Sequence, residues 1–83
     1  MKKLLYFSAD WCQPCKQLGA VMEKVSQFAP VQKINIDNNK KTAERYGVRN
    51  IPTVILIRED GIELARKVGV NPKQIYIDMY NQN

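Results

Sequence analysis

The chain has 83 residues, and its balance of 45% hydrophobic and 25% charged residues excludes a disordered chain and predicts one small domain over residues 1–83. Its net charge of +5 comes from basic residues spread over every segment, which predicts a solvated surface and no nucleic-acid partner. No stretch approaches the ~20 apolar residues of a membrane span, so no membrane role is expected.

Residues 2–7 are predicted to form a strand of leucine and aromatic residues. Two lysines followed by apolar residues resemble a secretory signal, but the apolar run is too short for one and leads directly into a cysteine motif. The motif holds both cysteines, Cys12 and Cys15, where the strand gives way to a helix. A cysteine pair of this kind is more typical of a catalytic site in a reducing cytoplasm than of a structural bridge.

Residues 14–28 are predicted to form that helix. Pro14 is tolerated in its first turn, and Pro30 ends it. Four residues recur at the spacing of a buried helix face: Cys15, Leu18, Met22 and Val25. This face directs Cys15 inward and leaves Cys12 outward.

Two cysteines separated by two residues at a helix start indicate dithiol chemistry. The unpaired N–H groups and positive dipole end of the helix favour a thiolate over a thiol, so Cys12 is the candidate nucleophile. A purely structural disulfide is the first alternative, although so short a ring gains least from loop entropy. Half of a zinc site is the second, but the chain has no histidine and no third cysteine, so no metal is expected.

A second strand is predicted from residue 31, ending at Asn35-Ile36-Asp37. The strand-helix-strand order implies parallel pairing and a right-handed crossover. Residues 42–46 are expected to form a short helix that Gly47 closes with a left-handed cap.

Residues 53–58 are nearly all β-branched or leucine, which predicts a central strand. Asp60-Gly61 is a turn signal that returns the chain as an antiparallel strand over residues 62–68. A last helix is predicted to begin with Asn71 as its N-cap, Pro72 at its first position and Gln74 reaching back. Its expected core face consists of Ile75 and Met79, with Tyr76 and Tyr80 half-buried.

This element order, with five short motifs at the matching spacing, resembles the thioredoxin family. The motifs are Trp11-Cys12-Gln13-Pro14-Cys15-Lys16, Ile34-Asn35-Ile36-Asp37, Tyr46-Gly47-Val48-Arg49, Ile51-Pro52-Thr53 and Lys67-Val68-Gly69. The resemblance implies an α/β thioredoxin-like fold with a four-stranded mixed sheet flanked by three helices. It also implies a minimal version, without the strand and helix with which full-length thioredoxins begin.

The resemblance further implies that Cys12 attacks a disulfide of a substrate protein and that Cys15 then attacks Cys12 to release the reduced substrate. A cis bond is implied between Ile51 and Pro52. The apolar groove around Cys12 would be formed by Trp11, Ile51, Pro52, Val68 and Gly69, with Gln13 and Pro14 also meeting the substrate. The alternatives to a groove role are that Val68 is an ordinary core residue and that Gly69 only ends a strand.

Electrons are expected from a thioredoxin-reductase-like donor. The chain itself is expected to hold no cofactor and to be a monomer. A glutaredoxin-like electron donor is one alternative, although glutaredoxins usually place proline directly after the first cysteine. A non-catalytic binding module that uses the same groove is another.

Three positions depart from the family pattern. Gln13 stands where the family usually has glycine, and Asn50 replaces the glycine usually found before the Ile-Pro pair. Tyr6 occupies the strand position where a buried aspartate usually lies beneath the resolving cysteine. Lys33 matches the lysine that accompanies that aspartate, although a solvated strand lysine explains it equally well. Tyr6 and Lys33 are therefore candidate modulators of the cysteine pair.

Overall fold

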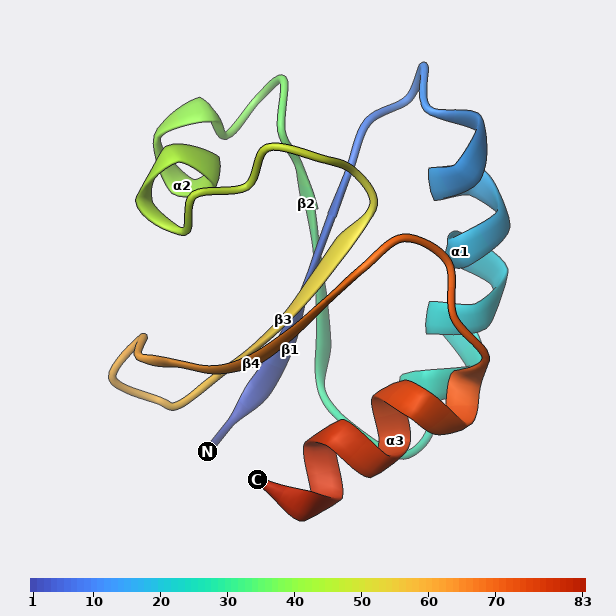
Figure 1. Cartoon of the computed structure of the whole chain (residues 1–83), viewed down its shortest axis with the longest axis vertical. Coiled ribbons are helices and arrows are strands. Elements are labelled where there is room, and N and C mark those ends of the chain that lie inside the picture. The colour runs from blue at the N-terminus through green and yellow to red at the C-terminus, as the bar shows by residue number, and fades with distance from the viewer.

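A mixed β-sheet forms the centre of the computed structural model, which describes residues 1–83 (Figure 1). Its elements in chain order are β1 (Lys3–Ser8), α1 (Gln13–Val25), β2 (Val31–Asn35), α2 (Lys40–Arg45), β3 (Thr53–Ile57), β4 (Glu63–Val68) and α3 (Lys73–Gln82). The strand order is β2-β1-β3-β4, with β1 parallel to β2 and β3 antiparallel to both β1 and β4. The predicted parallel unit, the inner strand and the hairpin are thus confirmed.

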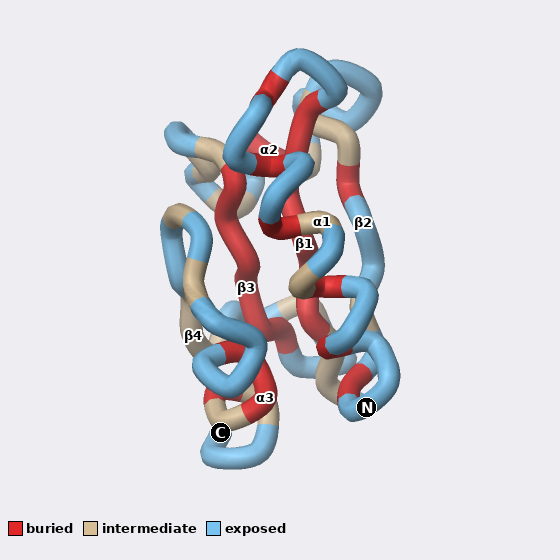
Figure 2. Tube along the Cα trace, turned by 90° about the vertical axis from the view of Figure 1, so that its right-hand side faces the viewer, coloured by how far each residue is buried: buried red, intermediate tan, exposed pale blue.

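The sheet is covered on both faces, with α1 and α3 on one side and α2 on the other (Figure 1). Alternation along β1 sends Leu4 and Tyr6 into the core under α1 and α3, while Leu5 and Phe7 pack on the α2 side. Strands β1 and β3 are buried along nearly their whole length (Figure 2). Because both faces are covered, their residues are apolar at nearly every position.

Helix α1 buries the predicted stripe of Cys15, Leu18, Met22 and Val25. Pro14 lies in its first turn, as predicted. The helix ends at Val25, three residues before the predicted end, and Phe28 is 60% exposed. The N–H groups of Phe28 and Ala29 still bond to the Val25 carbonyl, so a tight turn replaces the last helical residues before Pro30.

The shorter elements differ from prediction by one or two residues. Strand β2 ends at Asn35, helix α2 begins at Lys40, and Gly47 closes α2 with a φ of 63° as predicted. Strand β4 starts at Glu63, one residue later than predicted, and its pairing with β3 shifts register between Leu56 and Ile57.

The prediction for the start of α3 is wrong, and the prediction for its core face holds for Met79 but not for Ile75. The helix begins at Lys73, with Pro72 at the N-cap position and no side-chain cap. The backbone and side-chain N–H groups of Asn71 both donate to the Tyr76 hydroxyl. Gln74 donates to Asp78 instead of reaching back. Ile75 is 37% exposed and Tyr76 is fully buried, so Tyr76 takes the core position expected for Ile75. Tyr76, Ile77 and Met79 are buried, and Tyr80 is half-buried as expected. None of the helices has the length and apolar character needed to cross a membrane.

Candidate active site

The cysteine pair lies where β1 ends and α1 begins. Cys12 and Cys15 form a disulfide with their Cα atoms 5.2 Å apart. Cys12 is the N-cap of α1, and its sulfur accepts a hydrogen bond from the Cys15 backbone N–H at 3.2 Å. In the reduced protein this donor and the helix dipole favour negative charge on the Cys12 sulfur. The local geometry therefore suits a thiolate at Cys12.

Both cysteines are nearly inaccessible in the disulfide form, and the predicted outward position of Cys12 is wrong. Cys12 is only 5% exposed, because Ala9, Ile36 and Ile51 pack against the cysteine pair. The Cys12 sulfur lies 3.9 Å from the carbonyl oxygen of Ile51. Helical periodicity could not show this cover, since Ile36 and Ile51 lie on segments far along the chain.

The loop before β3 closes over the disulfide. Its Ile51–Pro52 peptide bond is cis, as the resemblance implied. Pro52 is buried and Ile51 is half-buried. The Gly69 N–H donates to the Pro52 carbonyl at 2.9 Å, and Gly69 has a φ of 88°, which glycine adopts without steric cost. Cys12, the cis-proline loop and the turn after β4 are thus held together.

Four segments meet at one edge of the sheet. The carboxyl ends of β1, β2 and β4 and the start of β3 lie there, because β3 runs opposite to the others. Val68 at the end of β4 is 56% exposed, so the alternative that it is plain core is wrong. Trp11 is 68% exposed and its indole N–H donates to Asp37 after β2 at 2.9 Å. Gln13 and Pro14 are exposed in the first turn of α1.

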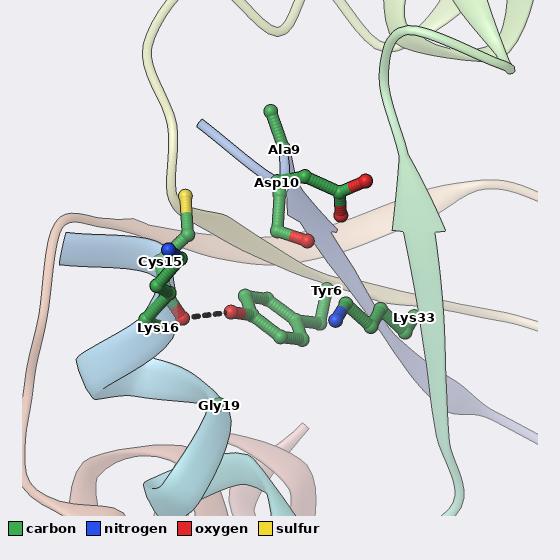
Figure 3. Close-up of a pocket in the computed structure, with 8 residues that line it drawn as sticks. Tyr6, Ala9, Asp10, Cys15, Lys16, Gly19 and Lys33 are labelled. Atoms are coloured by element: carbon green, nitrogen blue, oxygen red, sulfur yellow. Dashed lines mark hydrogen bonds between the residues drawn. The ribbon is translucent and has the colours of Figure 1, made fainter. Parts of the chain in front are cut away.

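A cavity of about 440 Å³ lies beside Cys15, between α1 and strands β1 and β2 (Figure 3). Its lining consists of Tyr6, Ser8, Ala9, Asp10, Cys15, Lys16, Gly19 and Lys33. The Tyr6 hydroxyl donates to the Cys15 carbonyl oxygen. Burial raises the pKa of the Tyr6 phenol, against a smaller lowering by a hydrogen bond with Ser8. Tyr6 is therefore a neutral hydrogen-bond donor at physiological pH.

Lys33 is an exposed residue of β2, paired in register with Tyr6, and it lines the same cavity. Asp10 is the cavity's carboxylate, and it is exposed on the loop before the cysteines. The structure thus places the phenol of Tyr6 beneath Cys15, and Asp10, Lys16 and Lys33 supply the charged groups that line the same cavity.

The family model described as Thioredoxin matches residues 1–81 of this chain. The chain belongs to the thioredoxin family. A thioredoxin of Chlamydia pneumoniae is 42% identical over 83 residues, which cover 96% of this chain and 80% of that protein. A thioredoxin of Haemophilus influenzae is 39% identical over 84 aligned positions, which cover 96% of this chain and 78% of that protein.

Among solved structures, a mutant thioredoxin from Halobacterium salinarum superposes with a TM-score of 0.89 at 36% identity, covering 98% of this chain and 73% of that one. The thioredoxin-like fold expected from the sequence is confirmed. Together with the cysteine pair, membership of the thioredoxin family makes this protein a thiol-disulfide oxidoreductase that reduces protein disulfides. Its partners are disulfide-containing substrates and a reductase.

Sequence reasoning missed Asp37, Val70 and Tyr76 at this thioredoxin-family site. Asp37 follows β2 at the edge where parallel strands end, and that position was a usable signal. Val70 is exposed in the turn beside Gly69. Tyr76 reaches that turn from α3, and no local pattern indicates such a contact.

Proposed function

We propose that Cys12 is the attacking cysteine and Cys15 the resolving one. The observation that carries this assignment is the hydrogen bond from the Cys15 N–H to the Cys12 sulfur at the N-cap of α1. The Cys12 thiolate attacks a substrate disulfide, forming a mixed disulfide and releasing one substrate sulfur as a thiolate that takes up a proton. The Cys15 sulfur then attacks Cys12, so the second substrate sulfur leaves and the Cys12–Cys15 disulfide forms. Two electrons pass from this protein to the substrate.

The sheet edge around Cys12 is the proposed substrate groove. The residues proposed to form it lie after β1, just before β3 and at the end of β4. They are Trp11, Gln13, Pro14, Ile51, Pro52, Val68 and Gly69. The exposure of Trp11 and Val68 supports this role, because large apolar side chains left in water mark contact surfaces. The backbone of Ile51, beside the Cys12 sulfur, offers hydrogen-bonding groups to an extended substrate segment.

Tyr6 and Lys33 are proposed to modulate the resolving step. A neutral phenol under Cys15 cannot act as a carboxylate base, so the Cys15 proton passes to water in the adjoining cavity or to the leaving sulfur. Lys33 lines that cavity as a cation. Resolution therefore quickens as pH rises toward the pKa of the Cys15 thiol.

The proposed electron donor is a thioredoxin-reductase-like dithiol enzyme, and the chain is proposed to act as a monomeric single domain without a cofactor. Supporting this, the Trp11-Cys12-Gln13-Pro14-Cys15 order differs from the glutaredoxin arrangement. A reducing compartment such as the cytoplasm suits a cycle that must return to the dithiol form.

The test combines turnover with trapping. Insulin disulfides should be reduced when the oxidised protein is recycled by a thioredoxin reductase, and much more slowly when glutathione is the only reductant. Cys15→Ser should accumulate a mixed disulfide through Cys12, whereas Cys12→Ser should neither reduce nor trap insulin. A trapped adduct on Cys15 of the Cys12→Ser variant would reverse the assignment, and faster recycling by glutathione would replace the proposed donor.

A further inference from the structure

The hydroxyl of Tyr76 is a buried polar group that the redox chemistry does not use. Tyr76 lies in α3 and is fully buried in the core under α1. Its oxygen makes three hydrogen bonds, all to the turn after β4: it donates to the Gly69 carbonyl and accepts from the backbone N–H and the side-chain amide of Asn71, each at 3.2 Å. One donor and two acceptor positions are the full capacity of a phenol, so this group is completely used in holding one turn.

The turn that Tyr76 holds is the outer wall of the proposed groove. The N–H of Gly69 donates to the Pro52 carbonyl at 2.9 Å, next to the residue whose carbonyl lies by the Cys12 sulfur. Val68 and Val70 flank Gly69 and are both exposed. A path of hydrogen bonds therefore runs from α3 through the turn to the cis-proline loop.

We propose that Tyr76 is a positioning residue for substrate binding, which fixes the turn of residues 68–70 against Pro52 before the substrate arrives. The proposal rests on the proposed groove. A turn with a left-handed glycine and two exposed valines gains little from packing, so without the phenol it samples more conformations. Ordering it on binding would then cost affinity, which a pre-organised wall avoids.

Tyr46 offers a matched control. Its hydroxyl donates to the carbonyl of Gly61 at 2.9 Å, and Gly61 has the same φ of 88° as Gly69. Gly61 follows β3, whereas Pro52 precedes it, so this contact lies at the opposite end of the strand from the groove. Tyr46→Phe removes the same kind of tyrosine–glycine hydrogen bond without touching the groove.

The experiment compares Tyr76→Phe with Tyr46→Phe in the full chain. The readouts are KM and kcat for insulin, the rate with a small aromatic disulfide, and amide hydrogen exchange. Tyr76→Phe removes all three hydrogen bonds to the turn. We expect the KM for insulin to rise roughly threefold to tenfold, because reordering the turn on binding then costs about as much as one net hydrogen bond, with a smaller change in kcat. The ratio of insulin rate to small-disulfide rate should fall, and the Gly69 and Asn71 amides should exchange faster. Tyr46→Phe should leave the KM for insulin unchanged.

Equal KM changes in the two variants would show a general loss of stability and overturn the proposal, as would an unchanged KM in a folded Tyr76→Phe protein. Should Tyr76→Phe fail to fold, Asn71→Ala removes only the side-chain donor, and an unchanged KM in that variant likewise overturns it. These outcomes are independent of the assignment of Cys12 and Cys15, which is read from trapping in the parent sequence. Loss of insulin turnover in the parent would instead contradict the proposed function.

Discussion

Replacing Tyr6 by phenylalanine should destabilise the protein by about 1 kcal/mol. The ring stays in the core and the volume hardly changes, so no cavity term arises. What is lost is the hydrogen bond from the phenol to the Cys15 carbonyl, and a neutral buried hydrogen bond contributes about 0.5–1.5 kcal/mol net. For a domain of this size that loss lowers Tm by roughly 4–8 °C.

The pH dependence of this difference follows from the direction of the Tyr6 pKa shift. Burial raises the pKa in the folded protein, so above the ordinary tyrosine pKa of ~10 the unfolded chain releases its proton first. The stabilising contribution is therefore complete below pH ~10 and is lost as pH rises through the folded pKa, by at most ~1.36 kcal/mol per pH unit. Tyr6→Phe lacks this loss, so the stability gap between wild type and variant should narrow above pH ~10.

Urea unfolding of the oxidised proteins, followed at neutral pH and in steps above pH 9, measures both effects. Tyr80→Phe is the control, because Tyr80 is half-buried and the contact of its ring with the Lys2 ammonium does not need the hydroxyl. We expect that control to change the free energy of unfolding by less than ~0.5 kcal/mol. Equal midpoints for wild type and Tyr6→Phe at neutral pH, or a gap that stays constant above pH 10, would refute the reasoning.

Three further predictions concern the site and the core. Tyr6→Asp, if folded, should add a titration to the pH-rate profile of mixed-disulfide resolution in single turnover; a profile that overlays the wild type would mean that proton removal from Cys15 is independent of this position. Gln13→Gly should shift the midpoint potential and the rate with a thioredoxin reductase, and since ~30 mV corresponds to ~1.4 kcal/mol a modest effect is measurable by redox titration. Unchanged values would mark Gln13 as a tolerated surface residue. Leu18→Ala should lower the free energy of unfolding by about 3 kcal/mol because Leu18 is fully buried, and a loss below ~1 kcal/mol by urea titration would contradict that core position.

Local patterns predicted most of the fold because they depend on neighbours along the chain. The apolar spacing from Cys15 to Val25 defined the buried face of α1, and the left-handed cap at Gly47 followed from the conformational freedom of glycine. The N-terminal position of the cysteine pair on α1 was likewise evident from strand and helix signals. Patterns along the chain also predicted the parallel β1–β2 unit and the β3–β4 hairpin. Family resemblance, carried by motifs, supplied the four-stranded mixed sheet and the cis bond before Pro52.

Two of the failures have different causes. Asn71 has the residue type of an N-cap, yet its N–H groups bind the hydroxyl of Tyr76, five residues along the chain, and Tyr76 is buried while Ile75 is exposed. Cys12 was predicted to face outward, but Ile36 and Ile51 cover it.

By itself, the sequence determined that a dithiol would lie at a helix start, between two parallel strands, and the family resemblance added that a phenol would lie beneath its second cysteine. Only the tertiary structure decided how closely that dithiol is enclosed. Asp37 binds the Trp11 indole, and Ile36 and Ile51 cover the cysteines, because the strand order brings the ends of all four strands to one edge. Helical and strand periodicities describe one element at a time, whereas this convergence depends on how the elements pair and pack.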